Sequence, residues 1–134
     1  KGIPMKFAKE TFTILCDDIR QEIGNKISLM GIYSKEIVVP SIPFVFPRLC
    51  LWLTAKDIKR EIADLKVVVT TPQNEPITND LPAPPHQEVP QDIQMGITIA
   101  PIKVNGEGEA KIEIFQKTES KPLITHYFSL RKVK

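Results

Sequence analysis

The chain has 134 residues, and its 18 basic and 16 acidic side chains give a formal net charge of +2. This length predicts one domain, and the 42% hydrophobic and 25% charged content excludes a wholly disordered chain. The even charge balance speaks against a nucleic-acid or membrane partner, and no run is long and apolar enough to cross a bilayer.

The domain is expected to cover residues 11–134, after an N-terminal segment at residues 1–10. Met5 opens a plausible native start, which makes residues 1–4 a remnant; if they are native, the start lies upstream and a removed signal becomes an alternative. No signal peptide is visible in the sequence as given, so a cytoplasmic location is expected. Cys16 and Cys50 lie in apolar runs and are expected to be buried free thiols, with an inter-sheet disulfide as the alternative.

Period-two hydrophobic alternation predicts the strands of an all-β protein. The clearest case is residues 92–100, where Ile93, Met95, Ile97 and Ile99 share one face. About seven or eight strands separated by turn signals indicate an antiparallel β-sandwich or barrel. In chain order, the predicted strands are residues 11–16, 27–33, 37–39, 49–54, 65–70, 92–100, 110–117 and 123–130, with 44–46 as a proline-bounded edge segment.

Three segments lack the strand pattern. Residues 17–26 are polar and are expected to form a connection with one helical turn at most. Residues 56–64 carry apolar residues at helical spacing, which predicts a short helix or a loop. Residues 71–91 contain six of the twelve prolines and are expected to form a long loop, a feature that is usually functional or mobile.

The first third of the chain resembles a known family. The segment Leu15-Cys16-Asp17-Asp18 precedes a Gly-Asn-Lys-hydrophobic strand at residues 24–33, and Pro47-Arg48-Leu49-Cys50-Leu51-Trp52-Leu53 follows. A Gly106-x-Gly108 turn and a last strand around Phe128 complete the pattern. These features are similar to an uncharacterised bacterial family of small proteins with an N-terminal Cys-Asp motif. The resemblance implies an immunoglobulin-like β-sandwich and carries no activity.

Asp17 and Asp18, with Glu22 nearby, form the densest acidic cluster. The first interpretation is capping, in which an aspartate accepts backbone N–H bonds at the start of a short turn that Gly24 ends. A Ca²⁺ site or a general acid/base pair is the weaker alternative, because the spacing of a calcium loop is missing. No cofactor is expected, and two cysteines without CxxC spacing do not make a zinc site.

The two histidines receive different interpretations. His126 shares a strand face with Ile124, Phe128 and Leu130, which predicts a hydrogen-bonded, half-buried side chain. A pairing of His126 with one of the cysteines is the catalytic alternative. His86 lies in the proline-rich loop and is expected to be solvated.

Two surfaces are candidates for binding a protein. One is the loop around Pro82, Pro84, Pro85 and His86, where a PxxP segment can adopt polyproline II. The other is the edge around Phe44 and Phe46, although the prolines there could simply protect an edge strand from pairing.

The sequence therefore favours a non-enzymatic protein-binding or scaffold module. A subunit of a larger bacterial assembly, or a homodimer formed through an exposed sheet face that includes Phe115, is the second hypothesis. An enzyme that uses Asp17 and Asp18 with His126 is the third.

Overall fold

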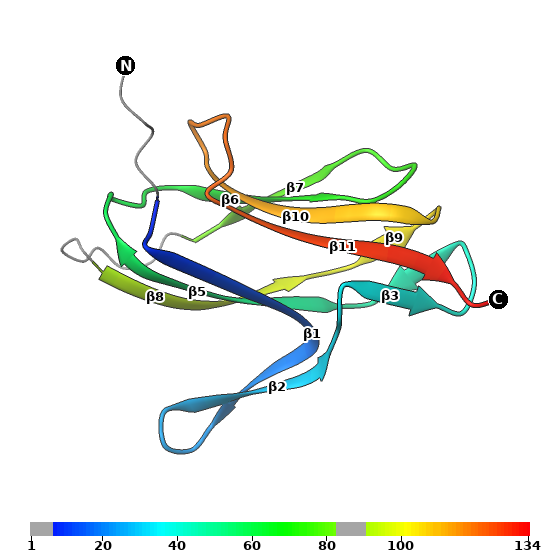
Figure 1. The fold of residues 1–134 in the computed structure, drawn as a ribbon, viewed down its shortest axis with the longest axis horizontal. Helices are drawn as coiled ribbons and strands as arrows, with labels where there is room; N and C mark the ends of the chain where they lie inside the picture. Colours follow the sequence, from blue (N-terminus) through cyan, green and yellow to red (C-terminus); the bar gives the residue numbers. More distant parts are fainter. Residues whose placement is uncertain (1–6, 83–90) are drawn as a thin grey trace.

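The computed structural model describes residues 7–82 and 91–134, and these two ranges fold into eleven β-strands (Figure 1). The described residues contain no helix, and so none that could span a membrane. The strands are β1 (Glu10–Glu22), β2 (Lys26–Ile32), β3 (Glu36–Val39), β4 (Phe44–Phe46), β5 (Leu49–Ile58), β6 (Leu65–Thr70), β7 (Ile77–Leu81), β8 (Gln91–Ile99), β9 (Ile102–Val104), β10 (Gly108–Gln116) and β11 (Ile124–Lys132).

The strands form two main sheets that pack face to face. Sheet A has the strand order β2-β1-β5-β8, and sheet B has the order β3-β11-β10-β6-β7. The short strands β4 and β9 form a two-stranded sheet of their own. All pairs are antiparallel except β3 with β11, which are parallel. The predicted all-β sandwich is therefore confirmed, with more strands than the seven or eight expected.

The core lies between the inner faces of sheets A and B, where alternate side chains are buried as the sequence pattern predicts. Ile97 and Ile99 are buried on β8 while their neighbours Gly96 and Thr98 are exposed. Each large aliphatic side chain removed from water contributes roughly 1.5–3 kcal/mol before entropy is counted, so this interface is the main stabilising term. The core includes Leu15, Leu51, Leu53, Val67, Val69, Ile97, Ile99, Ala110, Ile112, Ile114, Phe128 and Leu130.

The short helix expected near residues 56–64 is wrong. Strand β5 continues to Ile58, with Asp57 at a φ of 53° and a register irregularity against β8 between Ala55 and Ile58. Residues 59–64 are irregular. Ile58 and Ile62 have helical spacing because both pack against the end of the core near Phe7.

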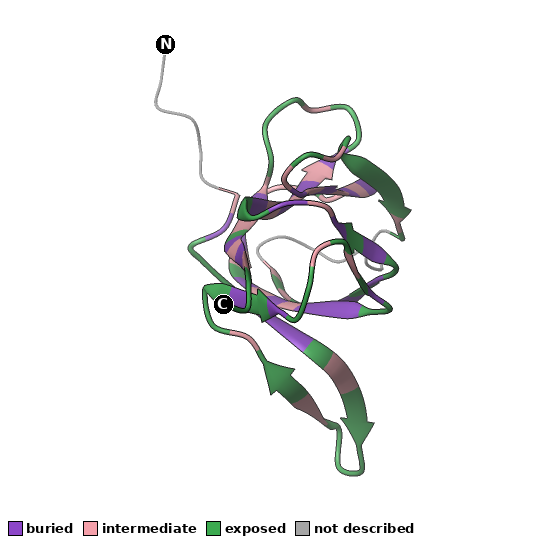
Figure 2. Ribbon diagram, turned by 90° about the vertical axis from the view of Figure 1, so that its right-hand side faces the viewer, coloured by how far each residue is buried: buried purple, intermediate pink, exposed green. Residues whose placement is uncertain are grey.

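The connection expected at residues 17–26 is also wrong, because these residues belong to a long β-hairpin. Strand β1 runs on to Glu22 and pairs with β2 from Cys16↔Ile32 to Glu22↔Lys26. We call residues 17–31 the hairpin arm. It extends away from the two sheets and is mostly exposed (Figure 2), so neither of its faces shows the apolar alternation by which a buried strand is recognised.

The hairpin arm bends out of sheet A at its base. Gly31 has a φ of +66°, a left-handed conformation that favours glycine, and a side chain there would collide with Asp17. Beyond the bend, Ile19 approaches the outer face of sheet A, where a Cβ on Gly96 would lie 3.0 Å from the Cδ1 atom of Ile19.

The proline-rich segment at residues 71–91 contains a strand that the sequence did not suggest. β7 lies inside it and pairs with β6 through five residue pairs, from Leu65↔Leu81 to Val69↔Ile77. β7 is exposed along nearly its whole length and forms the edge of sheet B. Its sequence therefore lacks apolar periodicity, although the backbone is fully extended.

Shortening a core side chain should destabilise the protein strongly. Leu51 is completely buried, so Leu51→Ala should lower the free energy of unfolding by about 2–5 kcal/mol, as urea denaturation would measure. Ile23 at the tip of the hairpin arm is 96% exposed, and Ile23→Ala should change it by less than about 0.5 kcal/mol. Equal losses from the two substitutions would contradict the assigned core.

Candidate functional site

One side of the sandwich, between β1 of sheet A and β11 of sheet B, brings together polar side chains from distant parts of the chain. The Thr13 Oγ1 atom lies 2.8 Å from Nδ1 of His126, a hydrogen bond between residues 113 positions apart. Both side chains are partly buried. The predicted half-buried, hydrogen-bonded His126 is thus confirmed, and its partner is a threonine of the opposite sheet.

The imidazole of His126 is neutral at neutral pH. Burial lowers the pKa of His126 below its usual value of 6.5, because the charged form loses hydration. A neutral ring accepts a hydrogen bond on one nitrogen, and the Thr13 hydroxyl donates to Nδ1 when the ring proton is on Nε2. The ring also lies 6.3 Å from that of Phe128, centroid to centroid, at the margin of the core.

The chain crosses from sheet A to sheet B beside this hydrogen bond. After β2, residues 33–35 pass over to β3, and the Lys35 carbonyl accepts a 2.7 Å bond from the Ser129 backbone N–H. The crossing closes one end of an open depression of about 410 Å³. The depression is lined by Thr13, Tyr33, Ser34, Lys35, Thr125, His126 and Tyr127.

A second depression, of about 260 Å³, lies near the start of β1 and just before the start of β11. Thr11 lines it two residues before Thr13, and Leu123 lines it two residues before Thr125. Because alternate residues of a strand share a face, the two depressions follow one another between β1 and β11. We call them together the β1–β11 trough. The second depression is completed by Phe7, Ala8 and Lys9.

Tyr33 links the trough to the core and to the base of the hairpin arm. Its hydroxyl donates a short hydrogen bond to Oδ1 of Asp17. Burial raises the pKa of Tyr33, and the neighbouring Asp17 carboxylate raises it further. Its ring meets that of Phe46 edge-on at 6.4 Å. Tyr33 is therefore a fixed, neutral side chain at the wall of the trough.

The structure places Asp17 and Asp18 within strand β1, not at the turn that the capping interpretation required. Asp18 forms ion pairs with Arg48 and, at 3.3 Å, with Arg20. The hydrogen bond from Arg20 is the main reason why the pKa of Asp18 is lowered. The two carboxylates are thus already engaged with different partners.

The acid/base and metal alternatives find little support in this geometry. Asp18 pairs with arginines while His126 pairs with Thr13, so the two are not hydrogen-bonded to each other. In residues 7–82 and 91–134, no group of three or more His, Cys, Asp or Glu side chains could hold a metal ion.

The other predicted binding residues are not gathered at the trough. Phe46 is buried in the core and Phe44 is partly buried against it, with the two rings edge-on at 5.0 Å. β4 therefore presents only Val45, which is 50% exposed, to the surroundings. Pro82 is exposed at the end of β7, whereas Pro84, Pro85 and His86 lie outside the described residues.

Cys16 and Cys50 are buried free thiols, as expected. They lie directly opposite each other in the β1–β5 pairing, and the Cys50 sulfur is 3.7 Å from the hydroxyl of Thr98. Burial raises the pKa of Cys16, and the neighbouring Cys50 raises it further. The cysteine–histidine pairing considered from the sequence does not occur, because His126 bonds to Thr13 while Cys16 contacts the Asp18 carbonyl at 3.5 Å.

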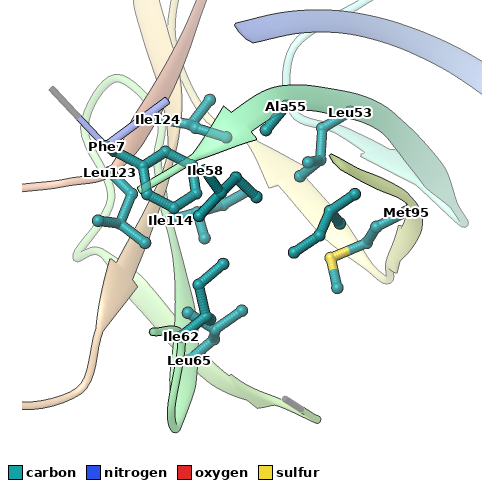
Figure 3. Close-up of a pocket in the computed structure, with 11 residues that line it drawn as sticks. Phe7, Leu53, Ala55, Ile58, Ile62, Leu65, Met95, Ile114, Leu123 and Ile124 are labelled. Atoms are coloured by element: carbon teal, nitrogen blue, oxygen red, sulfur yellow. The ribbon is translucent and has the colours of Figure 1, made fainter. Parts of the chain in front are cut away.

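A partly open cavity of about 20 Å³ lies at the end of the core between the two sheets (Figure 3). Its wall is entirely apolar and comes from eleven residues that include Phe7, Ile58, Ile62 and Leu123. A space of this size holds about one water molecule, and an apolar wall offers such a water no partner. The cavity is therefore a packing gap and not a ligand site.

Residues 11–121 match the model of a family of unknown function (DUF6941). No match was found among curated proteins.

The buried imidazole should make stability depend on pH. The folded protein resists protonation of His126, so the unfolded chain binds more protons as the pH falls below 6.5. The free energy of unfolding should therefore fall between pH 7.5 and 5.5, as chemical denaturation would measure. Asp18 contributes nothing in this interval, because its lowered pKa places its titration below pH 4.

A pair of variants tests whether His126 causes this pH dependence of stability. His126→Gln should flatten the decline, whereas His86→Gln, at the chain's other histidine, should leave it in place. The same decline in all three proteins would show that the pH dependence does not come from His126.

Proposed function

The chain belongs to the family of unknown function DUF6941, and we propose that it is a non-enzymatic protein-binding module whose contact surface is the β1–β11 trough. The observation that carries the proposal is the trough itself, an open depression lined by aromatic rings, hydroxyls and lysines. Tyr127, 60% exposed at its rim, is the kind of side chain that concentrates binding energy at interfaces.

The polar groups of the trough support binding better than catalysis. Thr13 and Nδ1 of His126 are hydrogen-bonded to each other, and burial, together with the hydrogen bond to Asp17, raises the pKa of Tyr33. A nucleophilic threonine would need a base that a third group orients, and the trough supplies no carboxylate next to His126. Open, mixed polar and aromatic surfaces of this kind are typical of transient protein contacts.

We also propose that the sandwich is immunoglobulin-like. Two sheets of four and five strands, with sequence-distant neighbours such as β1 with β5 and β3 with β11, support this architecture. Bacterial origin and a cytoplasmic location remain predictions from the sequence.

A homodimer is a second candidate, and exposed apolar side chains at and beside the base of the hairpin arm favour it. Met30 and Ile32 on β2 are 45% and 61% exposed, and Phe12 on the neighbouring stretch of β1 is 57% exposed. Phe115, which the sequence suggested for this role, is instead partly buried, with the Lys66 ammonium 5.3 Å from its ring centre. Exposed aliphatic residues on a projecting hairpin are a surface that a second copy could cover.

Removing the aromatic rim of the trough should weaken partner capture. Tyr127→Ala should reduce recovery of the partner from a lysate of the source organism at least about tenfold, which corresponds to about 1.4 kcal/mol. Ile77→Ala is the matched control, because Ile77 is an exposed apolar residue on β7, at the edge of sheet B farthest from β11 in the strand order. Equal recovery of the same proteins by both variants would contradict the assignment of the trough.

The dimer candidate has its own measurement. Light scattering on the wild-type protein at millimolar concentration should give twice the chain mass, and Ile32→Asp should restore the monomer by placing a charge on the apolar surface. A wild-type monomer at that concentration would exclude the dimer.

A further inference from the structure

Each of the two strands that border the trough has a stretch of unpaired edge. β11 pairs with β10 from Ile124 to Leu130 but with β3 only from Ser129 onward. β1 pairs with β5 from Glu10 to Cys16 but with β2 only from Cys16 onward. Within the described part of the chain, no strand lies against the outer side of residues 124–128 of β11 or of residues 10–14 of β1, whereas the Leu15 carbonyl already accepts a 2.9 Å bond from the Tyr33 backbone N–H.

The direction of the backbone groups on β11 follows from one hydrogen bond. The Ser129 N–H donates to the Lys35 carbonyl, so it points toward the side on which β3 lies. Backbone N–H and C=O groups of alternate residues in a strand point to the same side. The backbone groups of Tyr127 and Thr125 therefore point to this side too, where β3 has already ended.

These two residues also line the trough, so the unpaired backbone edge and the depression coincide. An extended segment in the trough would continue the line of β3 and complete the pairing of β11. Five unpaired residues correspond to roughly 17 Å of strand. Addition of a strand to an exposed sheet edge is an established mode of peptide recognition, in which the main chain supplies affinity and side chains supply specificity.

The charges of the trough indicate which segment would fit. The charged side chains that line its two depressions are Lys9 and Lys35, and no carboxylate lines either one. Lys9 and Lys35 are exposed. Glu36, next to Lys35, already pairs with Arg131 at 3.1 Å. The side chains of a bound segment would therefore meet positive charge and hydroxyl groups, which complements an acidic strand.

We infer that the β1–β11 trough accepts an extended acidic segment of a partner protein, which adds as a strand beside Thr125–Tyr127 of β11. This inference rests on the proposed function and specifies its binding mode. The segment would alternate β-branched with acidic residues, so that acidic side chains reach Lys9 and Lys35.

Three synthetic octapeptides test whether the partner binds by strand addition and whether the trough prefers acidic side chains. The first alternates Val and Glu, the second alternates Val and Lys, and the third is the Val-Glu peptide with N-methyl groups on every amide. We expect the Val-Glu peptide to bind and to slow hydrogen exchange of the Thr125 and Tyr127 amides in NMR spectra. The N-methylated peptide should not bind, because neither of its edges can donate a hydrogen bond to β11. The Val-Lys peptide should bind about 2- to 10-fold more weakly at low salt, as expected for two exposed ion pairs.

A charge reversal supplies the matched control. The double variant Lys9→Glu, Lys35→Glu changes two exposed side chains and should reverse the order of the Val-Glu and Val-Lys peptides. Glu10→Lys, which reverses an exposed charge that does not line the trough, should leave the order unchanged.

Several outcomes would overturn the inference. Binding of the N-methylated peptide would exclude strand addition, and equal binding of the two charged peptides would exclude the acidic preference. Slow exchange of the Thr125 and Tyr127 amides in the free protein would show that another segment of the chain already covers the edge. If this protection rises with protein concentration, a second copy is the occupant. Failure of all three peptides would refute strand addition, whereas the proposed function would fail only if Tyr127→Ala leaves partner capture intact.

Discussion

The contact between the inner faces of sheets A and B is the constraint on which the rest of the structure depends. Every second side chain of the long strands enters this contact, as on β8 and β10, and the packed side chains are apolar. A sandwich of this kind fixes the rigid body of the molecule but leaves its sides open, because sheets end at edge strands. What the molecule can bind is therefore decided where the aliphatic interior meets solvent.

On the side between β1 and β11, this boundary carries several polar contacts between distant parts of the chain. Thr13 and His126 join the two sheets by a hydrogen bond, and the chain crosses between them at residues 33–35. Tyr33 belongs at once to the crossing, to the core contact with Phe46 and to the base of the hairpin arm through Asp17. The polar groups of the trough are thus held in place by strands and by the crossing segment. Such a fixed arrangement favours binding of a partner whose shape already fits, without rearrangement of the trough.

Sequence reasoning succeeded where a strand has one buried face and failed where it has none. Residues 92–100 and 110–117 show alternation and were placed correctly, whereas β7 and residues 17–22 of the hairpin arm are largely exposed and were taken for loops. At residues 56–64 the helix alternative failed, because Ile58 and Ile62 pack at the end of the core with helical spacing, whereas the loop alternative holds for residues 59–64. The half-buried state of His126 could be predicted from its apolar neighbours in the strand. Its bond to Thr13 could not, because Thr13 lies 113 residues away and a local sequence pattern does not predict contacts at that separation.

The bend at Gly31 has a consequence for how the hairpin arm can vary. The arm is anchored at its base by the pairs of Asp17 with Tyr33 and of Asp18 with Arg48, whereas Ile23 at its tip is almost wholly in solvent. Inserting one residue into each strand near the tip would extend the reach of the arm by roughly 3.3 Å and leave the anchored register unchanged. Insertions and deletions can therefore change the length of this hairpin without altering the packing of the aliphatic interior.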